Sequence, residues 1–469
     1  MKYTAINIGP IFSTLGMARK PGELWAASFL FSHLMKCIYQ VAENRELEII
    51  SPAKPTTDNG EVGLYPDRIF FKGEIDTVSL LHDAMGVFFS NLSEGESPKP
   101  NLPDLNYFNL MTAHCEDDKE SMAVGKLNHQ LDVLELCNFA KEDNALETIY
   151  KIISKEGYAS LYKLATGKDI SFKSIEDIAK IGICNAPKEK SHFRYFCVVQ
   201  ADGDNIGTTI SHKGLKDGDI SEISQALVDF GSKATDLINK FGALPIYAGG
   251  DDLLFIAPVI GKDGSKHIFN LLDELESVAF KKVHDTVEKL HLKNDEGKYI
   301  EASLSFGVSI TYHKYPLYEA LETARTLLLE KAKGINDKKA IAWSLRKHSG
   351  GTFEAKFSRK GSNLWSQFLD LIKATTDDDT VSAIAQKIRQ EEALVDIVLE
   401  SERQEERLDA LFEKVLEFDN SKKAYFDAVK AIMPTLYKVI GEEKTLFTKA
   451  LYCLLRTAKF IKGEDLHDE

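Results

Sequence analysis

Two short polar runs, each set against apolar stretches, decide the fold of this chain. The first is Ala201-Asp202-Gly203-Asp204-Asn205, which ends the apolar, β-branched stretch Phe193–Gln200. The second is Gly249-Gly250-Asp251-Asp252, which joins the short apolar stretches Leu244–Ala248 and Leu253–Pro258 and is typical of a hairpin turn. Together they predict a buried strand and a later hairpin, with carboxylates at the strand end and at the hairpin tip.

The segments around these runs alternate between strand and helix patterns. Apolar residues from Ile223 to Phe241 lie on one helical stripe between the two runs. After the hairpin, the pattern predicts helix over Ile268–Leu290, strand over Ser303–Thr311, helix over Leu317–Lys333 and strand over Ala340–Leu345. The order β-α-β-β-α-β-α-β begins with the ferredoxin-like arrangement of a polymerase palm.

The rest of the chain divides into blocks on either side of this palm. Residues 1–125 mix short strands with helices, and 126–189 are mainly helical. The palm is predicted over 190–350 and a helical domain over 351–469. The individual elements predicted in the first two blocks are the strands Tyr3–Ile8 and Asp67–Phe71 and the helices Leu131–Ala140 and Ala145–Ile153.

Composition narrows the class of protein. The 469 residues carry a formal net charge of -14, which argues against a broad basic surface that grips nucleic acid. Six scattered cysteines without a C-x-x-C pair fit a reducing cytosol and predict no zinc site. There is no signal-peptide pattern, and no apolar run approaches the roughly 20 residues of a membrane span. We therefore expect a soluble cytoplasmic protein without a membrane partner.

The carboxylates of the two polar runs predict a metal site. In a βαββ sheet the end of the first strand adjoins the hairpin tip, so Asp202, Asp251 and Asp252 are expected to converge. Such a cluster repels itself in a low-dielectric setting, and a divalent cation relieves that repulsion. Because hard oxygen ligands favour Mg²⁺ or Mn²⁺, we interpret these three residues as metal ligands and catalytic residues of a two-metal nucleotidyltransferase.

Residues beside the carboxylates are candidates for nucleotide binding. Gly249 and Gly250 fit a tight turn with positive φ, and also a close approach of backbone to a base or sugar. Lys333, like Lys338 or Lys339, could neutralise a triphosphate, although a solvated helix end explains it equally well. Ser305, on the strand after the hairpin, is a further candidate for contact with the base, although a half-buried position in the strand is the more ordinary role for this serine. The remaining candidates are Gly203, Asp204 and Asn205.

These residues resemble a known family, the large subunit of type III CRISPR RNA-guided effector complexes, in its Cmr (type III-B) branch. The runs at 202–205 and 249–252 resemble the family's second palm, and the C-terminal helical block resembles its last domain. The resemblance implies an α+β fold with two ferredoxin-like palms, a small helical insert and a C-terminal all-helical domain. The strings that resemble the first palm are Ile8-Gly9-Pro10-Ile11, Ala18-Arg19-Lys20, Leu24-Trp25-Ala26-Ala27-Ser28 and Gly63-Leu64-Tyr65-Pro66-Asp67-Arg68.

The resemblance also implies an activity and partners. The subunit would work with other subunits of a complex that holds crRNA and is switched on by target RNA. ATP would lie between the two palms, with metal ligands on the second palm only. The product would be an adenylate second messenger, commonly cyclic oligoadenylate. Some members of the family join AMP to S-adenosylmethionine instead, and the sequence leaves this choice open.

Two features of larger family members are not expected here. Many carry an N-terminal HD nuclease, but His82-Asp83 is a single pair and is best interpreted as a surface pair. Many also carry a zinc-binding cysteine cluster, and His114-Cys115 could supply at most half of a metal site.

Two other functions remain as alternatives. One is a GGDEF-type diguanylate cyclase, whose hairpin continues with Glu-Phe where this chain has Asp252-Leu253. The other is a catalytically inactive scaffold, which the intact acidic positions disfavour. We also expect the helices from about residue 360 onward to dock other subunits, and their deletion to leave the palm folded.

Overall fold

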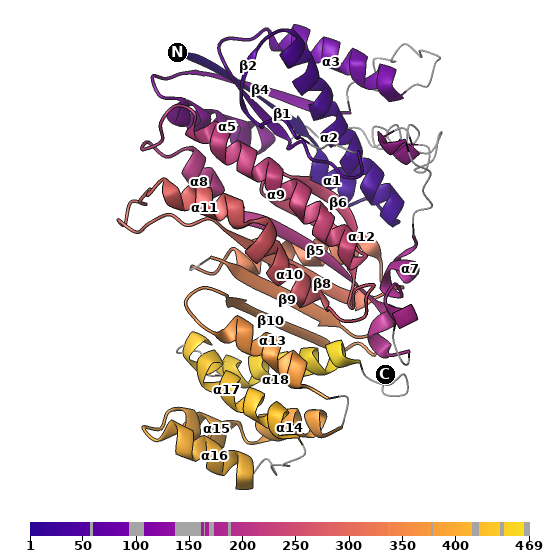
Figure 1. Ribbon diagram of the computed structural model, residues 1–469, viewed down its shortest axis with the longest axis vertical. Coiled ribbons are helices and arrows are strands. Elements are labelled where there is room, and N and C mark those ends of the chain that lie inside the picture. The colour runs from indigo at the N-terminus through magenta and orange to yellow at the C-terminus, as the bar shows by residue number, and fades with distance from the viewer. Residues whose placement is uncertain are drawn as a thin grey trace.

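The two sheets and the C-terminal helices follow one another along the longest axis of the molecule, with the N-terminal sheet at one end (Figure 1). The predicted helix Ala145–Ile153 lies outside the described residues. The computed structural model describes residues 1–56, 60–92, 107–136, 161–163, 165–167, 173–185, 189–336, 338–376, 379–414, 422–440 and 445–463.

The first sheet is antiparallel and has the strand order β2-β3-β1-β4. The chain order β1-α2-β2-β3-α3-β4 gives it the ferredoxin-like arrangement. Alternate residues of β1 face opposite sides: Ile6 packs in the core with α2 and α3, whereas Ala5 packs in the core with α5. The elements are β1 (Lys2–Gly9), α1 (Ile11–Leu15), α2 (Pro21–Asn44), β2 (Glu48–Ser51), β3 (Arg68–Lys72), α3 (Thr77–Leu92), β4 (Asn109–Glu116) and α5 (Glu120–Leu136).

The second sheet has the order β10-β9-β8-β5-β7-β6, and within it β8-β5-β7-β6 repeats the ferredoxin-like pattern. All its pairs are antiparallel except β8 with β9. The elements from the connecting segment onward are α7 (Ile175–Ala179), η1 (Ile183–Asn185), η2 (Ser191–Arg194), β5 (Tyr195–Asp204), α8 (Ile206–Ile210), α9 (Asp219–Phe241), β6 (Leu244–Gly249), β7 (Asp252–Pro258), α10 (Ile268–Glu274), η3 (Leu275–Ala279), α11 (Lys281–Lys289), β8 (Ser303–Tyr312), α12 (Leu317–Thr326), η4 (Leu327–Ala332), β9 (Ala340–Arg346) and β10 (Thr352–Ser358).

The palm elements predicted from sequence are confirmed, with three differences. Strand β5 extends through Asp204, because 202–204 pair with β8, so the run 202–205 is mostly strand and only Asn205 leaves it, with a φ of 65°. The two predicted helices Ile268–Leu290 and Leu317–Lys333 each contain a π-helical turn, η3 in the first and η4 in the second. Strand β10 was not predicted, and it extends the sheet beyond residue 350, where the palm was expected to end.

The two palms pack directly against each other through α2 and β6 (Figure 1). The Ser28 hydroxyl donates to the carbonyl of Ile246 at 2.8 Å, and the Ala248 N–H donates to the carbonyl of Gly63 at 3.0 Å. The segment around Gly63 therefore runs beside β6 and ends near the hairpin that carries the predicted metal ligands.

The C-terminal helices share a core with the second sheet. Trp343 on β9 is fully buried, stacks on Phe368 with ring centroids 5.2 Å apart, and donates its N–H to the Thr457 hydroxyl at 3.1 Å. Deleting these helices would expose this core, so we expect the deletion to destabilise the palm, in contrast to the prediction from sequence that it folds without them. The helices are α13 (Leu364–Ala374), α14 (Asp379–Gln390), α15 (Glu392–Leu399), α16 (Gln404–Lys414), α17 (Lys423–Ile440) and α18 (Thr445–Lys462).

Among the described residues, no helix combines the length and the apolar character that crossing a bilayer requires.

Candidate active site

Strand pairing brings the predicted carboxylates to one edge of the second sheet. Strand β5 lies between β8 and β7, and the pairing of Ala201 with Leu253 is the last of the β5–β7 ladder. One step further along this register, Asp202 comes opposite Asp252. The edge predicted from the order of the elements is thus the edge that the structure forms.

Gly203 allows Asp251 to lie directly over the backbone of β5. A Cβ atom at Gly203 would be 2.6 Å from Asp251 Cβ and 2.7 Å from Asp251 Oδ2, which no side chain permits. Gly250, with a φ of 65°, makes the tight turn that presents Asp251, whereas Gly249 is the last residue of β6 and pairs with Asp252. Of the two hairpin glycines, only Gly250 has positive φ.

Burial, with repulsion between carboxylates, raises the pKa of Asp251 and Asp252. Burial, followed by repulsion from Asp202, raises the pKa of Asp251 to about 7. Loss of hydration, then repulsion from Asp251 and Asp202, raises the pKa of Asp252 well above its ordinary value. Burial also raises the pKa of Asp202, although Lys333 opposes this shift. The cluster therefore binds protons unless a cation compensates its charge.

The first palm contributes a carboxylate that sequence reasoning did not select. Asp67 lies at the start of β3, and its charge raises the pKa of Asp251, of Asp252 and of the buried Tyr247. Its neighbour Pro66 lies 3.8 Å from the position of a Cβ atom at Gly250. Asp67 was part of a string quoted for the family resemblance, but only the packing of the two palms shows that it faces the hairpin.

Asp204 has a structural position that differs from the predicted one. It is 1% exposed and accepts hydrogen bonds from Ser303 Oγ at 2.7 Å, Ser305 Oγ at 2.9 Å, Lys333 Nζ at 2.9 Å and the Lys339 N–H at 2.9 Å. Ser305 has no exposed surface. Both residues were candidates for nucleotide binding, but here both are buried and support the end of the strand, which for Ser305 agrees with the strand position that the sequence favoured. Nucleotide contact by Asp204 or Ser305 stays a prediction.

Lys333 lies inside this carboxylate cluster. Its Nζ donates to the carbonyl of Gly203 at 2.8 Å and lies 3.3 Å from Asp202 Oδ1, and its side chain is 17% exposed. Burial lowers the pKa of Lys333, but attraction to Asp202 and Asp204 outweighs that effect and raises it. Lys333 is thus a fixed cation beside the predicted metal ligand Asp202. Contact between Lys333 and a triphosphate stays a prediction.

Asn205 also turns away from the hairpin. Its amide nitrogen donates to the carbonyl of Glu301 at 2.9 Å, which ties the end of β5 to the segment before β8. Any contact between Asn205 and a nucleotide stays a prediction.

The carboxylates fit a hard divalent cation by their chemistry. Oxygen atoms of Asp202, Asp251 and Asp252 are the donors that Mg²⁺ and Mn²⁺ prefer, and the raised pKa values mark repulsion that a cation would relieve. These three residues are not among the described groups whose ligand atoms all lie within 4.8 Å of one another, and Asp202 Oδ1 lies 3.3 Å from Lys333 Nζ. These three residues are the ones that would hold the ion.

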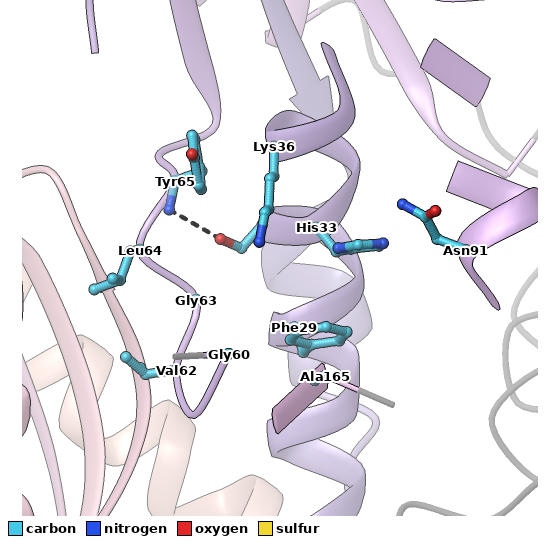
Figure 2. A pocket seen from close by; sticks show the side chains of 11 residues that line it. Phe29, His33, Lys36, Gly60, Val62, Gly63, Leu64, Tyr65, Asn91 and Ala165 are labelled. Atoms are coloured by element: carbon cyan, nitrogen blue, oxygen red, sulfur yellow. Dashed lines mark hydrogen bonds between the residues drawn. The ribbon is translucent and has the colours of Figure 1, made fainter. Parts of the chain in front are cut away.

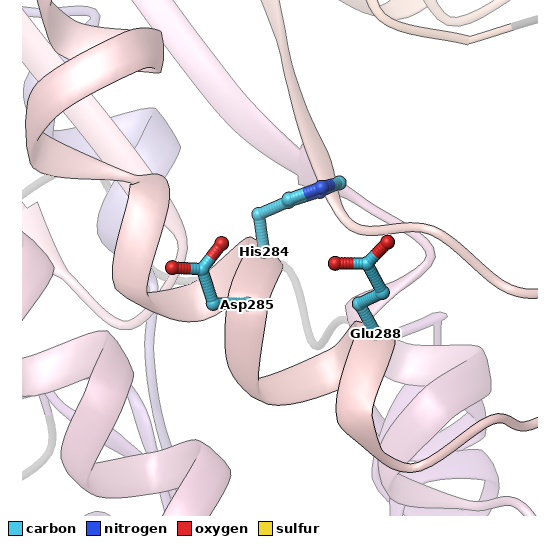
Figure 3. A group of neighbouring side chains, drawn as sticks. All are labelled: His284, Asp285 and Glu288. Atoms are coloured by element: carbon cyan, nitrogen blue, oxygen red, sulfur yellow. The ribbon is translucent and has the colours of Figure 1, made fainter.

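A second group of possible ligands lies on helix α11. Within the described part of the chain, the one set of three whose ligand atoms all lie within 4.8 Å is His284, Asp285 and Glu288 (Figure 3). Nδ1 of His284 is 2.9 Å from the carbonyl of Ala302, and Asp285 pairs with Lys281 at 3.3 Å. Because its carboxylates lie on a helix away from the hairpin, this group provides control substitutions for those at Asp251 and Asp252.

Other predicted features lie away from this edge. A cavity of about 270 Å³ in the first palm, between α2 and the segment 60–65, is lined by Phe29, His33 and Lys36 (Figure 2) and contains no predicted site residue. His82 is exposed on α3, and its neighbour Asp83 forms an ion pair with Arg45.

The stabilisation of the chain by metal should depend on pH. Carboxylates with raised pKa destabilise the fold as pH rises through those values, because the folded chain must then carry their unpaired charge. A bound cation removes this cost only where the carboxylates are ionised. We expect Mg²⁺ or Mn²⁺ to raise the melting temperature more at about pH 8 than at about pH 6, measured by calorimetry. Equal shifts at both pH values, or an equal shift in Asp251→Asn, would contradict this.

Comparison with known proteins agrees with this architecture. The family description "Cas10/Cmr2, second palm domain" matches residues 195–342, and "CRISPR-associated protein Cmr2, N-terminal" matches residues 3–117. Together the two matches cover more than half of the chain, the first sheet and the second sheet as far as the start of β9. The chain belongs to the Cas10/Cmr2 family.

Similar proteins share the fold over most of the chain. The CRISPR system Cmr subunit Cmr2 of Pyrococcus furiosus is 30% identical over 228 residues, which cover 41% of this chain but 23% of that protein. A type III-B Cmr-beta structure bound to cognate target RNA has a TM-score of 0.60 at 10% identity and covers 98% of this chain and 83% of that chain.

Two crystal structures of a Csm1–Csm4 cassette are also similar, each at 12% identity. The one in complex with AMPPNP has a TM-score of 0.54 and covers 97% of this chain and 69% of that chain. The one in complex with cA4 has a TM-score of 0.51 and covers 96% of this chain and 70% of that chain. At this identity, the likeness shows a shared fold.

Proposed function

We propose that this Cas10/Cmr2 chain is a metal-dependent nucleotidyltransferase that uses ATP within a type III CRISPR effector complex. The observation that carries the proposal is the convergence of Asp202, Asp251 and Asp252 at one edge of a palm sheet, where burial and repulsion from Asp202 raise the pKa of Asp251 and Asp252. The binding of AMPPNP and cA4 by the similar Csm1–Csm4 cassette supports ATP as substrate and an adenylate as product.

The proposed reaction is an adenylyl transfer. A hydroxyl oxygen of the acceptor bonds to the α-phosphorus of ATP, the bond from that phosphorus to the β-phosphate oxygen breaks, pyrophosphate leaves and the hydroxyl proton is released. Bound Mg²⁺ or Mn²⁺ would supply stabilisation of the negative charge on the phosphates. In this chain, Asp202, Asp251 and Asp252 hold the charge that anchors the cation, and Lys333 keeps Asp202 and Asp204 in place.

Two acceptors fit this chemistry. A second ATP that presents a ribose hydroxyl gives oligoadenylate, and ring closure gives the cyclic form. S-adenosylmethionine contains the same adenosine group and would give a conjugate with AMP. The acceptor would lie between the palms, where Asp67 of the first palm faces the hairpin.

The partners are proposed on the same basis. The Cmr-beta structure bound to cognate target RNA has this fold, which supports membership in a complex that binds crRNA and target RNA. The net charge of -14 favours RNA contact through neighbouring subunits rather than through this chain alone.

The test is a reaction of the assembled complex with labelled ATP, with and without matching target RNA and with and without S-adenosylmethionine. We expect pyrophosphate release that depends on target RNA, with the products identified by mass spectrometry. Abundant cyclic oligoadenylate that S-adenosylmethionine does not change would exclude the conjugate. Absence of pyrophosphate in every mixture would overturn the adenylyl transfer and favour an inactive scaffold, and turnover of GTP in place of ATP would favour a diguanylate cyclase.

A further inference from the structure

Arg359 is a buried cation between the palm and the C-terminal helices. Its side chain is 3% exposed, and arginine is almost never fully buried unless it is paired. Its Nη2 donates to Glu276 Oε2 at 2.6 Å and to the carbonyl of Leu304 at 2.5 Å. The guanidinium lies over the rings of Phe306 on β8 and Trp365 on α13, 4.9 and 5.6 Å from their centroids. Arg359 therefore joins elements of both domains.

Hydrogen bonds lead from Arg359 to the carboxylate cluster. Its backbone N–H donates to the carbonyl of Lys339 at 2.8 Å, and the Lys339 N–H donates to Asp204 Oδ2 at 2.9 Å. Glu276 accepts from Arg359 and also lies 3.6 Å from Lys339 Nζ. Asp204 in turn holds Lys333, whose Nζ lies 3.3 Å from Asp202. A continuous set of contacts thus connects Arg359 with a predicted metal ligand.

The backbone along this path is held in uncommon conformations. Lys338 and Lys339 have φ of 55° and 48°, a region that residues other than glycine seldom adopt and that persists where surrounding contacts hold it. The Ser358 hydroxyl donates to the carbonyl of Lys338 at 2.9 Å. Glu276 lies in the π-helical turn η3, and Lys333 directly follows the π-helical turn η4; such turns are frequent at functional sites.

We propose that Arg359 is a positioning residue that holds the predicted metal ligand Asp202 in place at the edge of the second sheet. The guanidinium of Arg359 fixes Glu276, and Glu276 in turn lies 3.6 Å from Lys339 Nζ, whereas the backbone N–H of Arg359 holds the Lys338–Lys339 turn whatever the side chain. This turn supplies the N–H that completes the hydrogen bonds of Asp204, so the guanidinium acts on it through Glu276. With Asp204 satisfied, Lys333 is shared between Asp204 and Asp202, which leaves Asp202 available to a cation. The inference rests on the proposed function.

The test compares Mn²⁺ binding by the full chain, measured by electron paramagnetic resonance, with turnover in the assembled complex. In Arg359→Met, we expect the apparent Kd for Mn²⁺ to rise about 10-fold, as for other residues that orient metal ligands. The metal concentration for half-maximal turnover should rise with it, with a smaller change in kcat at saturating metal. Arg359→Lys, which keeps the charge near Glu276, should restore part of the affinity.

Phe368→Leu is the matched control, because Phe368 packs in the same interdomain core but makes none of these hydrogen bonds. It should lower the melting temperature and leave the Kd for Mn²⁺ unchanged. Glu276→Gln provides a second variant if Arg359→Met does not fold. An unchanged Kd in Arg359→Met, or an equal rise in Phe368→Leu, overturns the inference. A wild-type chain that binds no Mn²⁺ removes the proposed function, and this inference with it.

Discussion

Replacing Asp251 and Asp252 together by alanine is expected to abolish ATP turnover and to leave the chain folded. The loss should be about 10³-fold or more, because the charge that develops on the phosphates would lose the cation that stabilises it. Folding should survive, since both residues lie at a hairpin tip and their raised pKa values show that their ionised forms are disfavoured in the folded chain by burial and by repulsion from Asp202. Asp202→Ala should have a similar effect on turnover.

The measurement is pyrophosphate release by the assembled complex, with circular dichroism as the check on folding. The control is Asp285→Ala with Glu288→Ala, which removes two carboxylates from the other group of possible ligands (Figure 3). We expect this control to keep near-normal turnover. Near-normal turnover in the variant of Asp251 and Asp252, or a loss of turnover in the control variant instead, would refute the assignment of Asp251 and Asp252 as metal ligands.

The fold of the catalytic palm could be predicted because its signals are local. The apolar stretch before Asp202 and the Gly-Gly-Asp-Asp turn each fix one element, and the ferredoxin-like order then fixes which strand ends meet. Strand β10 was missed although Thr352–Ser358 alternates strictly between polar and apolar residues, which is the pattern of a half-buried strand; its pairing with β9 confirms that pattern. Its omission placed the end of the palm at residue 350.

The roles of residues beside the carboxylates could not be predicted as well. Asp204 and Ser305 are polar residues of the kind that bind ligands, and the sequence alone does not show that they are buried. Their burial results from the pairing of β5 with β8 and from the contact of Asp204 with the Lys338–Lys339 turn. Asp67 is more than 180 positions from the hairpin in the chain, so its place near Asp251 follows from the contact between the palms. Arg359 has no local pattern at all.

These contacts divide the site into an edge that carries Asp202, Asp251 and Asp252 and a support around the fully buried Asp204. The edge, with Asp251 and Asp252 at its tip, carries charge that favours a cation, whereas the support neutralises Asp204 with Lys333 and two serine hydroxyls. Substitutions in the support should therefore change metal affinity through geometry, and substitutions at the edge should remove it. Gly203 belongs to both parts, since it separates Asp202 from Asp204 and lies under Asp251.

Gly203→Ala should thus lower turnover without unfolding the palm. The new Cβ would lie 2.6 Å from Asp251 Cβ and 2.8 Å from Ile206 Cγ1, so the hairpin tip must move away from β5. A displacement of about 1 Å at a catalytic group costs roughly 10²-fold in rate. We expect a fall of that order in kcat, measured as pyrophosphate release.

The matched control is Gly207→Ala, four residues further on at the start of α8, where a new Cβ meets nothing within 4 Å. Because alanine also favours helix, this control should retain turnover and gain slightly in stability. If both alanine variants keep full activity, the hairpin tip has moved without loss of catalysis. A metal ligand would not tolerate such a shift, so this result would exclude Asp251 as a ligand. If both lose activity equally, the effect of Gly203→Ala arises from general disturbance of this segment rather than from the contact with Asp251.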